Sequence, residues 1–458
     1  MVKGNNPISK FMMLPFFLAI LILSTLGPST ARASWTVVME DTIRDNGIIF
    51  VEAIDADSTA IVGIQNSAWV LRRSDDAGET WQDFTVTGEL ALPMFMTAHF
   101  ADETHGWLGG MGAIYRTEDG VSFTEVQIPG EWWGPFPLST VRYLRSYGTT
   151  RALAVGDSSS MSGTTSVLIL TTEDGGVTWT EVESSLAVSI NALESVDETH
   201  TWMAGANGYD LDGDDWPDRY DTGTILFSAD RGQTWSPLIE GLSFGVMYMD
   251  FTDTDRGWAV GTDGTSPIII VTEDGGASWR SLDLAAIGIP ADAEELLYIT
   301  VLSACEIWII GHRTAGDSID DLFLHSLDGG NAFDEEFDYE GSSVMFTWDF
   351  AGRTAGWAAG AYMTLLRYEP ETEDPGTDCT FPGGEPVVGE ESVTEEVAEA
   401  VEEDLEPGAE LEEEGEAPAE VPDAAEDVSG DTGDAADAAG EEPEEDGGKG
   451  GCGCAVAL

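Results

Sequence analysis

The sequence predicts an all-β chain whose main domain, residues 34–368, is a seven-bladed β-propeller. Two short motifs alternate along this domain, runs of β-branched and aromatic residues separate them, and the first segment of the domain matches a strand that the last repeat lacks. A leader, residues 1–33, precedes the domain. A disordered acidic linker, residues 369–446, and a Gly/Cys-rich end, residues 447–458, are expected to follow it.

The first motif is an octet with Ser or Thr at position 1, Asp at position 3, Gly at position 5 and an aromatic residue at position 8. Its copies read SDDAGETW at Ser74, TEDGGVTW at Thr172, SADRGQTW at Ser228 and TEDGGASW at Thr272, with weaker copies TEDGVSF at Thr117 and SLDGGNAF at Ser326. The pattern is typical of a hairpin turn in which the Asp side chain caps the turn and the Gly takes a positive φ. We therefore expect the octet aspartates to be structural rather than catalytic.

The second motif precedes each octet and has the form Gly-Trp-x-x-Gly. It reads GWLGG at Gly106, WMAG at Trp202, GWAVG at Gly257, IWIIG at Ile307 and GWAAG at Gly356, with faint copies AIVG at Ala60 and LAVG at Leu153. The fifth repeat shows the expected unit of four strands. Its strand a is 246–251, strand b starts at Trp258, strand c is 268–272 and strand d is 278–282, so the octet lies on the turn between strands c and d.

The seventh repeat, 343–369, contains strands a to c but no octet and no strand d. The missing strand is predicted at the other end of the domain, because SWTVVME (Ser34–Glu40) matches the strand-d segment TWTEVE (Thr178–Glu183). The N-terminal strand would then complete the last blade and close the ring, which removes the open sheet edge of an unclosed array.

The octets resemble Asp-box (BNR) repeats of sialidases and sortilin-type receptors. Combined with the Gly-Trp motif, the repeats resemble the photosystem II stability and assembly factor family, whose Arg-Ile-Pro motif near the N-terminus does not occur here. The resemblance implies a propeller and only weakly implies a function, because one fold carries many functions.

A candidate calcium loop lies between strands b and c of the fourth repeat, on the face opposite the octets, where we expect the functional surface. It reads DLDGDDWPDRYD and resembles the calcium loops of thrombospondin type 3 repeats. Positions 1, 3, 5, 7, 9 and 12 match the ligand spacing of an EF-hand loop. These are Asp210, Asp212, Asp214, Trp216 (through its carbonyl), Asp218 and Asp221. Asp215 stands where such loops carry Gly, and the alternative is a solvated acidic loop.

An aromatic loop, GEWWGPFPL, connects the second and third repeats on the same face. Its Trp132, Trp133 and Phe136 suit stacking on sugar rings or a protein-binding hot spot. The alternative is a loop that packs onto its own blade.

The cysteines fall into two pairs. Cys305 lies in the predicted a–b turn of the sixth repeat and Cys379 follows strand c of the seventh, on the same face, so we expect a disulfide in an oxidising compartment. Cys452 and Cys454 lie in GGKGGCGCAVAL, which resembles the start of a myxobacterial-type C-terminal sorting signal. That resemblance implies anchoring at the outer cell surface, and a zinc-ligand pair is the alternative.

The leader predicts export. Lys3 and Lys10 give a positive start, 11–27 is apolar, and Ala31-Arg32-Ala33 is a cleavage site before Ser34. An uncleaved anchor helix is the alternative, although the apolar core is short for a membrane span.

Charge excludes several partners. The chain has 86 Asp and Glu against 18 Lys and Arg, a formal net charge of −68, which argues against nucleic acid and against anionic membranes. No motif of a catalytic nucleophile or metal-binding histidine pair is found. The sequence therefore predicts a monomeric, non-catalytic, exported propeller, tethered at the cell surface, that carries a structural Ca²⁺ and binds a protein or glycan. The alternatives are a surface glycan hydrolase of sialidase-like type and an envelope assembly factor.

Overall fold

The structure is a computed structural model. It describes residues 34–387 apart from residues 44, 89–93, 131, 134–135, 160–164, 185, 187–188, 210–218, 316–317, 338–343 and 370–378. All regular elements in the described part are strands. No helix that could span a membrane occurs in these residues.

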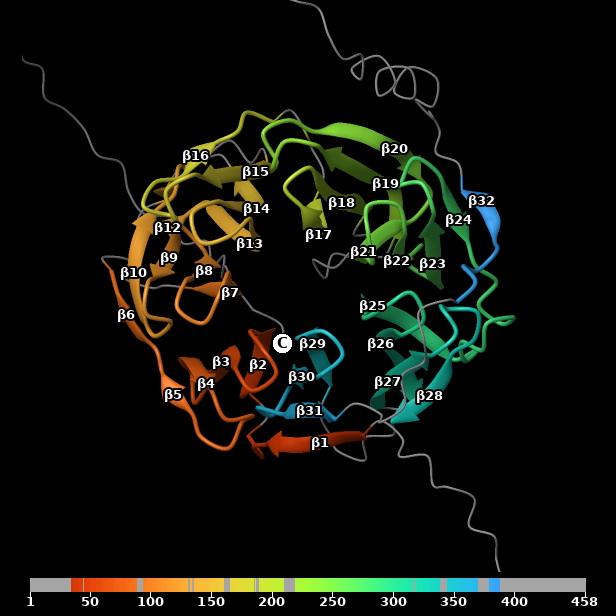
Figure 1. Ribbon diagram of the computed structural model, residues 1–458, viewed down its shortest axis with the longest axis horizontal. Helices are drawn as coiled ribbons and strands as arrows, with labels where there is room; N and C mark the ends of the chain where they lie inside the picture. The colour runs from red at the N-terminus through yellow and green to blue at the C-terminus, as the bar shows by residue number, and fades with distance from the viewer. Residues whose placement is uncertain are drawn as a thin grey trace, which may run out of the picture.

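Seven antiparallel sheets surround a central axis, as Figure 1 shows. Blade 1 contains β2 (Gly47–Ala53), β3 (Thr59–Gln65), β4 (Ala68–Ser74) and β5 (Gln82–Asp83). Blade 2 contains β7 (Phe95–Phe100), β8 (Gly106–Gly110), β9 (Ala113–Thr117) and β10 (Ser122–Gln127). Blade 3 contains β13 (Ser139–Ser146), β14 (Ala152–Ser159), β15 (Thr165–Thr172) and β16 (Thr180–Glu181). Blade 4 contains β17 (Ser189–Asp197), β18 (His200–Tyr209), β19 (Arg219–Ser228) and β20 (Ser236–Leu242).

The remaining three blades follow the same order from the axis outward. Blade 5 contains β21 (Gly245–Phe251), β22 (Gly257–Thr262), β23 (Pro267–Thr272) and β24 (Trp279–Ser281). Blade 6 contains β25 (Ala293–Val301), β26 (Ile307–Ala315), β27 (Ser318–Ser326) and β28 (Asp334–Phe337). Blade 7 contains β29 (Met345–Phe350), β30 (Gly356–Gly360), β31 (Leu365–Glu369) and β1 (Ser34–Met39). The predicted seven-bladed architecture is confirmed.

The N-terminal strand closes the ring as predicted. β1 runs antiparallel to β31, with Ser34 opposite Glu369 and Val37 opposite Leu366. The hydrophobic core consists of seven clusters, one between each pair of neighbouring blades. Each blade therefore buries both sheet faces against its neighbours, and the closing strand contributes Trp35 to the cluster between blades 6 and 7.

The octets form the turns between the third and fourth strands of their blades. In the third blade, the Asp174 carboxylate accepts hydrogen bonds from the N–H (2.9 Å) and hydroxyl (2.7 Å) of Thr178, and the Thr172 hydroxyl accepts the N–H of Gly176 (2.9 Å). Gly176 has φ 83°, and a Cβ there would lie 2.3 Å from the Nε1 atom of Trp107. The octet aspartate thus caps a turn, in agreement with the structural role expected for it.

The two motifs contact each other between blades. The Nε1 atom of Trp107 in blade 2 donates to the carbonyl of Gly175 in the octet of blade 3 (3.2 Å). In the same way, Trp202 of blade 4 donates to Gly275 in the octet of blade 5 (2.8 Å). These hydrogen bonds between the two motifs join blade 2 to blade 3 and blade 4 to blade 5.

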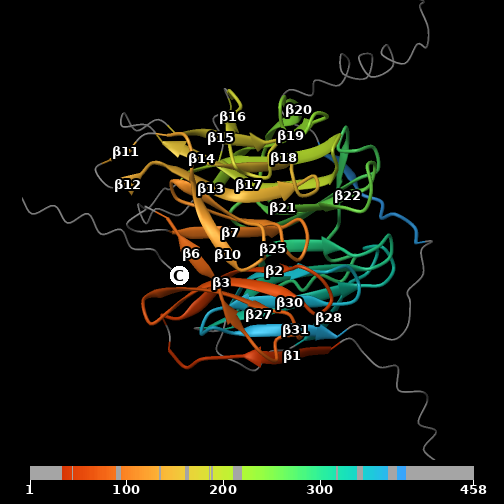
Figure 2. The ribbon, with the colours of Figure 1, turned by 60° about the vertical axis from the view of Figure 1, so that its left-hand side comes forward.

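Three short elements lie outside the four-stranded pattern. β6 (Thr85–Thr87) adds parallel to β10, and β11 (Trp132–Trp133) pairs with β12 (Phe136–Pro137) in a small ribbon at the edge of the molecule (Figure 2). β32 (Glu385–Val387) adds antiparallel to β24. The last element corrects the expectation of a disordered linker from residue 369 onward, because residues 379–387 pack on blades 5 and 6 through a disulfide, an aromatic contact and strand pairing.

Candidate functional site in the central channel

One position of each innermost strand lines the central channel. It is the residue that stands opposite the Trp of the Gly-Trp motif, or opposite Ala60 and Leu153 in the two faint copies. We call these seven residues the channel ring, in blade order Glu52, His99, Arg145, Glu194, Asp250, Thr300 and Asp349. All seven line one cavity of about 650 Å³. Six of the seven are titratable.

Side chains of the channel ring join neighbouring blades. Nδ1 of His99 lies 2.9 Å from Oε1 of Glu52, and both side chains are less than one fifth exposed. Nη2 of Arg145 donates to Oε2 of Glu194 across 3.0 Å. Such pairs are held in place by partial burial, where screening by water is weaker than at the surface.

Carboxylates of the channel ring also accept backbone N–H groups that point into the channel. Asp250 accepts the N–H of Val301 in blade 6, and Asp349 accepts the N–H of Ala53 in blade 1, each at 2.7 Å. These N–H groups follow the ring position by one residue and belong to strands with no inner neighbour. A carboxylate of the preceding blade therefore satisfies a donor that would otherwise lack a partner.

A second chain of contacts continues from the first pair. Nε2 of His99 lies 3.0 Å from the hydroxyl of Ser146 in blade 3, so Glu52, His99 and Ser146 form an acid–imidazole–hydroxyl series. Serine hydrolases use this order. Here the series links blades 1, 2 and 3 in the way that the Arg145–Glu194 pair links blades 3 and 4. This similarity favours a structural role for the series.

Aromatic and hydroxyl side chains line the channel two residues before the ring. Tyr143, Tyr248 and Tyr298 belong to this layer together with Phe50. The hydroxyl of Tyr143 donates to the carbonyl of Asn191 (2.6 Å), and the rings of Tyr248 and Tyr298 lie 4.8 Å apart. The cavity therefore combines ring faces for apolar or sugar contacts with a polar ring for orientation.

Burial changes the protonation of the ring. Burial, and next the nearby charge of Glu52, raise the pKa of Asp349 to about 8. Burial, and next the charge of Glu194, raise the pKa of Asp250 well above its ordinary value. Burial opposes ionisation of Arg145, but the carboxylate of Glu194 outweighs it and raises the pKa of Arg145. Near neutral pH the Asp349 carboxyl is thus mostly protonated. The charge of Arg145 is balanced by the adjacent carboxylate of Glu194.

The channel ring lies close to the octet face. In six blades the ring residue is followed within two residues by the turn between the first two strands, and in blade 4 the strand β17 continues from Glu194 to Asp197 before this turn. Turns of this kind contact the octets of their own blades. For example, the N–H of Gly175 donates to the carbonyl of Thr150 (2.7 Å) and that of Gly275 donates to Asp255 (2.8 Å). The sequence analysis expects the functional surface on the face opposite the octets, so this cavity lies outside that expectation.

The sequence-predicted site residues have different outcomes. Five of the six proposed calcium ligands, Asp210, Asp212, Asp214, Trp216 and Asp218, lie outside the described residues, and Asp221 lies in β19 without a described side chain. Trp132, Trp133 and Phe136 belong to the ribbon β11–β12, and their side chains are also outside the description. Cys452 and Cys454 lie outside it as well.

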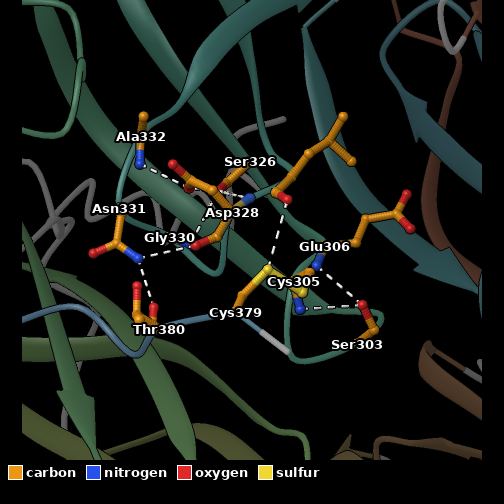
Figure 3. Close-up of a disulfide and its surroundings, with 11 residues drawn as sticks. Ser303, Cys305, Glu306, Ser326, Asp328, Gly330, Asn331, Ala332, Cys379 and Thr380 are labelled. Carbon is orange, nitrogen blue, oxygen red and sulfur yellow. Dashed lines mark hydrogen bonds between the residues drawn. A yellow bond between two sulfur atoms is a disulfide. The ribbon is translucent and has the colours of Figure 1, made fainter. Parts of the chain in front are cut away.

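The predicted cysteine pair is joined in the structure. The sulfur atoms of Cys305 and Cys379 are 2.12 Å apart (Figure 3). No group of three or more His, Cys, Asp or Glu side chains suited to a metal is found in the described part of the chain. The channel ring was missed at the sequence level, although aligning the repeats on the Gly-Trp motif would have placed its members in one column.

The chain is a seven-bladed β-propeller. No protein-family model and no curated protein matches it. Among solved structures, YCF48 bound to D1 peptide is similar, with 20% identity over 76% of this chain and 100% of that one at a TM-score of 0.54. YCF48 from Cyanidioschyzon merolae is similar with 16% identity, covering 74% of this chain and 100% of that one at a TM-score of 0.50. An ancestral GH74 enzyme is similar with 10% identity, covering 73% of this chain and 46% of that one at a TM-score of 0.50. At these identities the likeness concerns the fold.

Proposed function

We propose that the protein binds a protein or glycan partner in its central channel and does not act on it as an enzyme. The observation that carries this proposal is the cavity of about 650 Å³, lined by all seven blades, with tyrosine rings beside a polar ring. A propeller of similar fold, YCF48, has been solved with a D1 peptide bound, and this supports a peptide segment as one kind of partner.

Charge narrows the class of partner. The two arginines that line the cavity are both paired, Arg145 with Glu194 and Arg142 with Asp157. An anionic group would meet no free arginine there and would face a chain with a formal charge of −68. The partner is therefore proposed to be a neutral glycan or a protein segment that is neutral or basic.

Blocking the channel tests this proposal. Thr300 lines the cavity and is uncharged, so Thr300→Trp fills the channel without removing an ion pair. We expect the full chain to retain ligands on a glycan array or proteins from a cell-surface extract, and Thr300→Trp to lose them. Val177→Trp places the same side chain on an exposed site of an octet and should bind normally. Equal binding by both variants would exclude the channel as the site.

A structural Ca²⁺ in the blade-4 loop is part of the proposal. Six oxygen ligands at EF-hand spacing would be supplied by Asp210, Asp212, Asp214, the carbonyl of Trp216, Asp218 and Asp221. Calcium binding would neutralise carboxylates that otherwise repel one another. Calorimetry should show Ca²⁺ binding that is lost in Asp212→Ala and Asp214→Ala and kept in Asp255→Ala. Unchanged binding in the loop variants would remove this site.

Export and tethering complete the proposal. The leader would be cleaved before Ser34, and the Cys452–Cys454 region would attach the chain to the outer cell surface. Mass spectrometry of the protein recovered from its own cells should give an N-terminus at Ser34 and a modified Cys452 or Cys454. A soluble protein with both cysteines unmodified would contradict the tether.

A serine hydrolase is a second candidate function, favoured by the series Glu52, His99 and Ser146. If the protein is a serine hydrolase, a fluorophosphonate probe will label Ser146 in the wild type but not in His99→Ala. We expect no labelling, because the series forms one link of the structural ring.

A further inference from the structure

The chain does not leave the molecule where blade 7 ends. After β31 it returns to blade 6, where Cys379 is bonded to Cys305 in the turn before β26 and Asn331 donates its side-chain N–H to the carbonyl of Thr380 (2.6 Å). Figure 3 shows that Cys379 and Thr380 lie against the octet turn of this blade. We call residues 379–387 the tail strap.

The tail strap continues from blade 6 to blade 5. The ring of Phe381 lies 4.6 Å from that of Trp258, and the guanidinium of Arg280 lies 5.7 Å from the Phe381 ring. β32 then pairs with β24 from Trp279 to Ser281. Gly384 permits this approach, because a Cβ there would lie 2.3 Å from the carbonyl oxygen of Ser281. A covalent bond, an aromatic contact and a strand ladder thus hold one nine-residue segment.

The ladder that closes the ring is vulnerable at the end where the chain leaves it. β31 is the last strand of the domain, and its final residue, Glu369, is opposite Ser34, the first residue of β1. A pull on the chain after Glu369 would open the β31 ladders one residue pair at a time, starting from this end. Peeling the strand would separate blade 7 and open the ring.

The disulfide changes where such a pull enters the domain. Force applied to residues after Cys379 reaches the domain at Cys305, next to β26 in the middle of blade 6, and bypasses Glu369. The loop closed by the disulfide has a sequence separation of 74 residues and contains β26 to β31. Three strands of blade 6 and three strands of blade 7 therefore lie between the bonded cysteines.

We propose that the tail strap is a mechanical clamp: it carries tension from the C-terminal tail into blade 6 and keeps that tension off the strand that closes the ring. This inference gives a mechanical reason for fastening the tail and rests on the proposed C-terminal tether. The experiment below measures only the clamp. A negative result would therefore not bear on the tether or on the binding function, which have their own experiments.

The experiment is single-molecule pulling of the full chain between its body and its C-terminus. A biotin-acceptor peptide inserted between Asn66 and Ser67, an exposed hairpin turn of blade 1, gives the body handle, and Leu458 carries the other. The oxidised wild type is compared with the Cys305→Ser/Cys379→Ser double variant and with the wild type under reductant. We expect the first rupture at a lower force in both unbridged forms.

Extension gives a second readout. Complete unfolding of the oxidised chain should release roughly 260 Å less contour length than the double variant, since the 74-residue separation stays bridged at about 3.5 Å per residue. Gly384→Val displaces β32 but keeps the disulfide, so its first rupture of a blade should match the wild type. Equal rupture forces with and without the disulfide, or a loss in Gly384→Val as large as in the double variant, would overturn the clamp.

Discussion

Replacing Trp35 with alanine is expected to lower the free energy of unfolding by about 3–5 kcal/mol, the usual cost of removing a buried tryptophan side chain. Trp35 is 6% exposed and comes from the strand that closes the ring. Its ring lies 5.3 Å from that of Phe323 in blade 6 and 5.4 Å from that of Tyr368 in blade 7. The substitution therefore removes packing between two blades as well as within one.

Chemical denaturation of the full chain measures this effect. Val37→Ala is the matched control, because Val37 lies two residues further along the same strand but is 49% exposed, so truncation removes little buried surface. Trp35→Phe should retain part of the stability, since a smaller ring still fills some of the space. A loss below about 1 kcal/mol in Trp35→Ala would show that β1 contributes little to ring closure.

The closing strand could be predicted because its evidence lies in short sequence motifs. Ser34–Glu40 resembles strand d of another repeat, and the seventh repeat lacks that strand, so both halves of the argument are visible in the sequence. The tail strap could not be predicted in the same way. β32 has three residues, and it lies in an acidic segment without apolar periodicity, so only Cys379 marked the region.

The channel ring escaped prediction for a different reason. Its members include Glu, His, Arg, Asp and Thr, so no single residue type repeats, in contrast to the tryptophan that faces each of them in the strong repeats. A position that is fixed in geometry but variable in residue type does not appear as a motif, and it is found only when the repeats are aligned on the Gly-Trp motif. The calcium and aromatic loops were identified because their composition is unusual, and they remain proposals.

Replacing Asp349 with asparagine is expected to change the free energy of unfolding more favourably at pH 8 than at pH 5. Burial and the charge of Glu52 raise the pKa of Asp349 to about 8 from an ordinary value of 3.8. A raised pKa means that the folded state holds a proton that the unfolded chain releases. Its contribution to stability is therefore full below pH 3.8 and is lost progressively as pH rises toward 8.

Asparagine removes this loss, because it does not ionise in either state and its side-chain oxygen can still accept the N–H of Ala53. Between pH 5 and pH 8 the stability of Asp349→Asn relative to the wild type should rise by about 2–4 kcal/mol, measured by denaturation at the two pH values. Asp174→Asn is the control. The N–H and hydroxyl of Thr178 lower the pKa of Asp174 to about 2, so its contribution is present above pH 3.8 and changes only in more acidic solution. A constant difference between Asp349→Asn and the wild type across this range would mean that Asp349 is ionised in the channel, and the ring would then carry one more negative charge toward its partner.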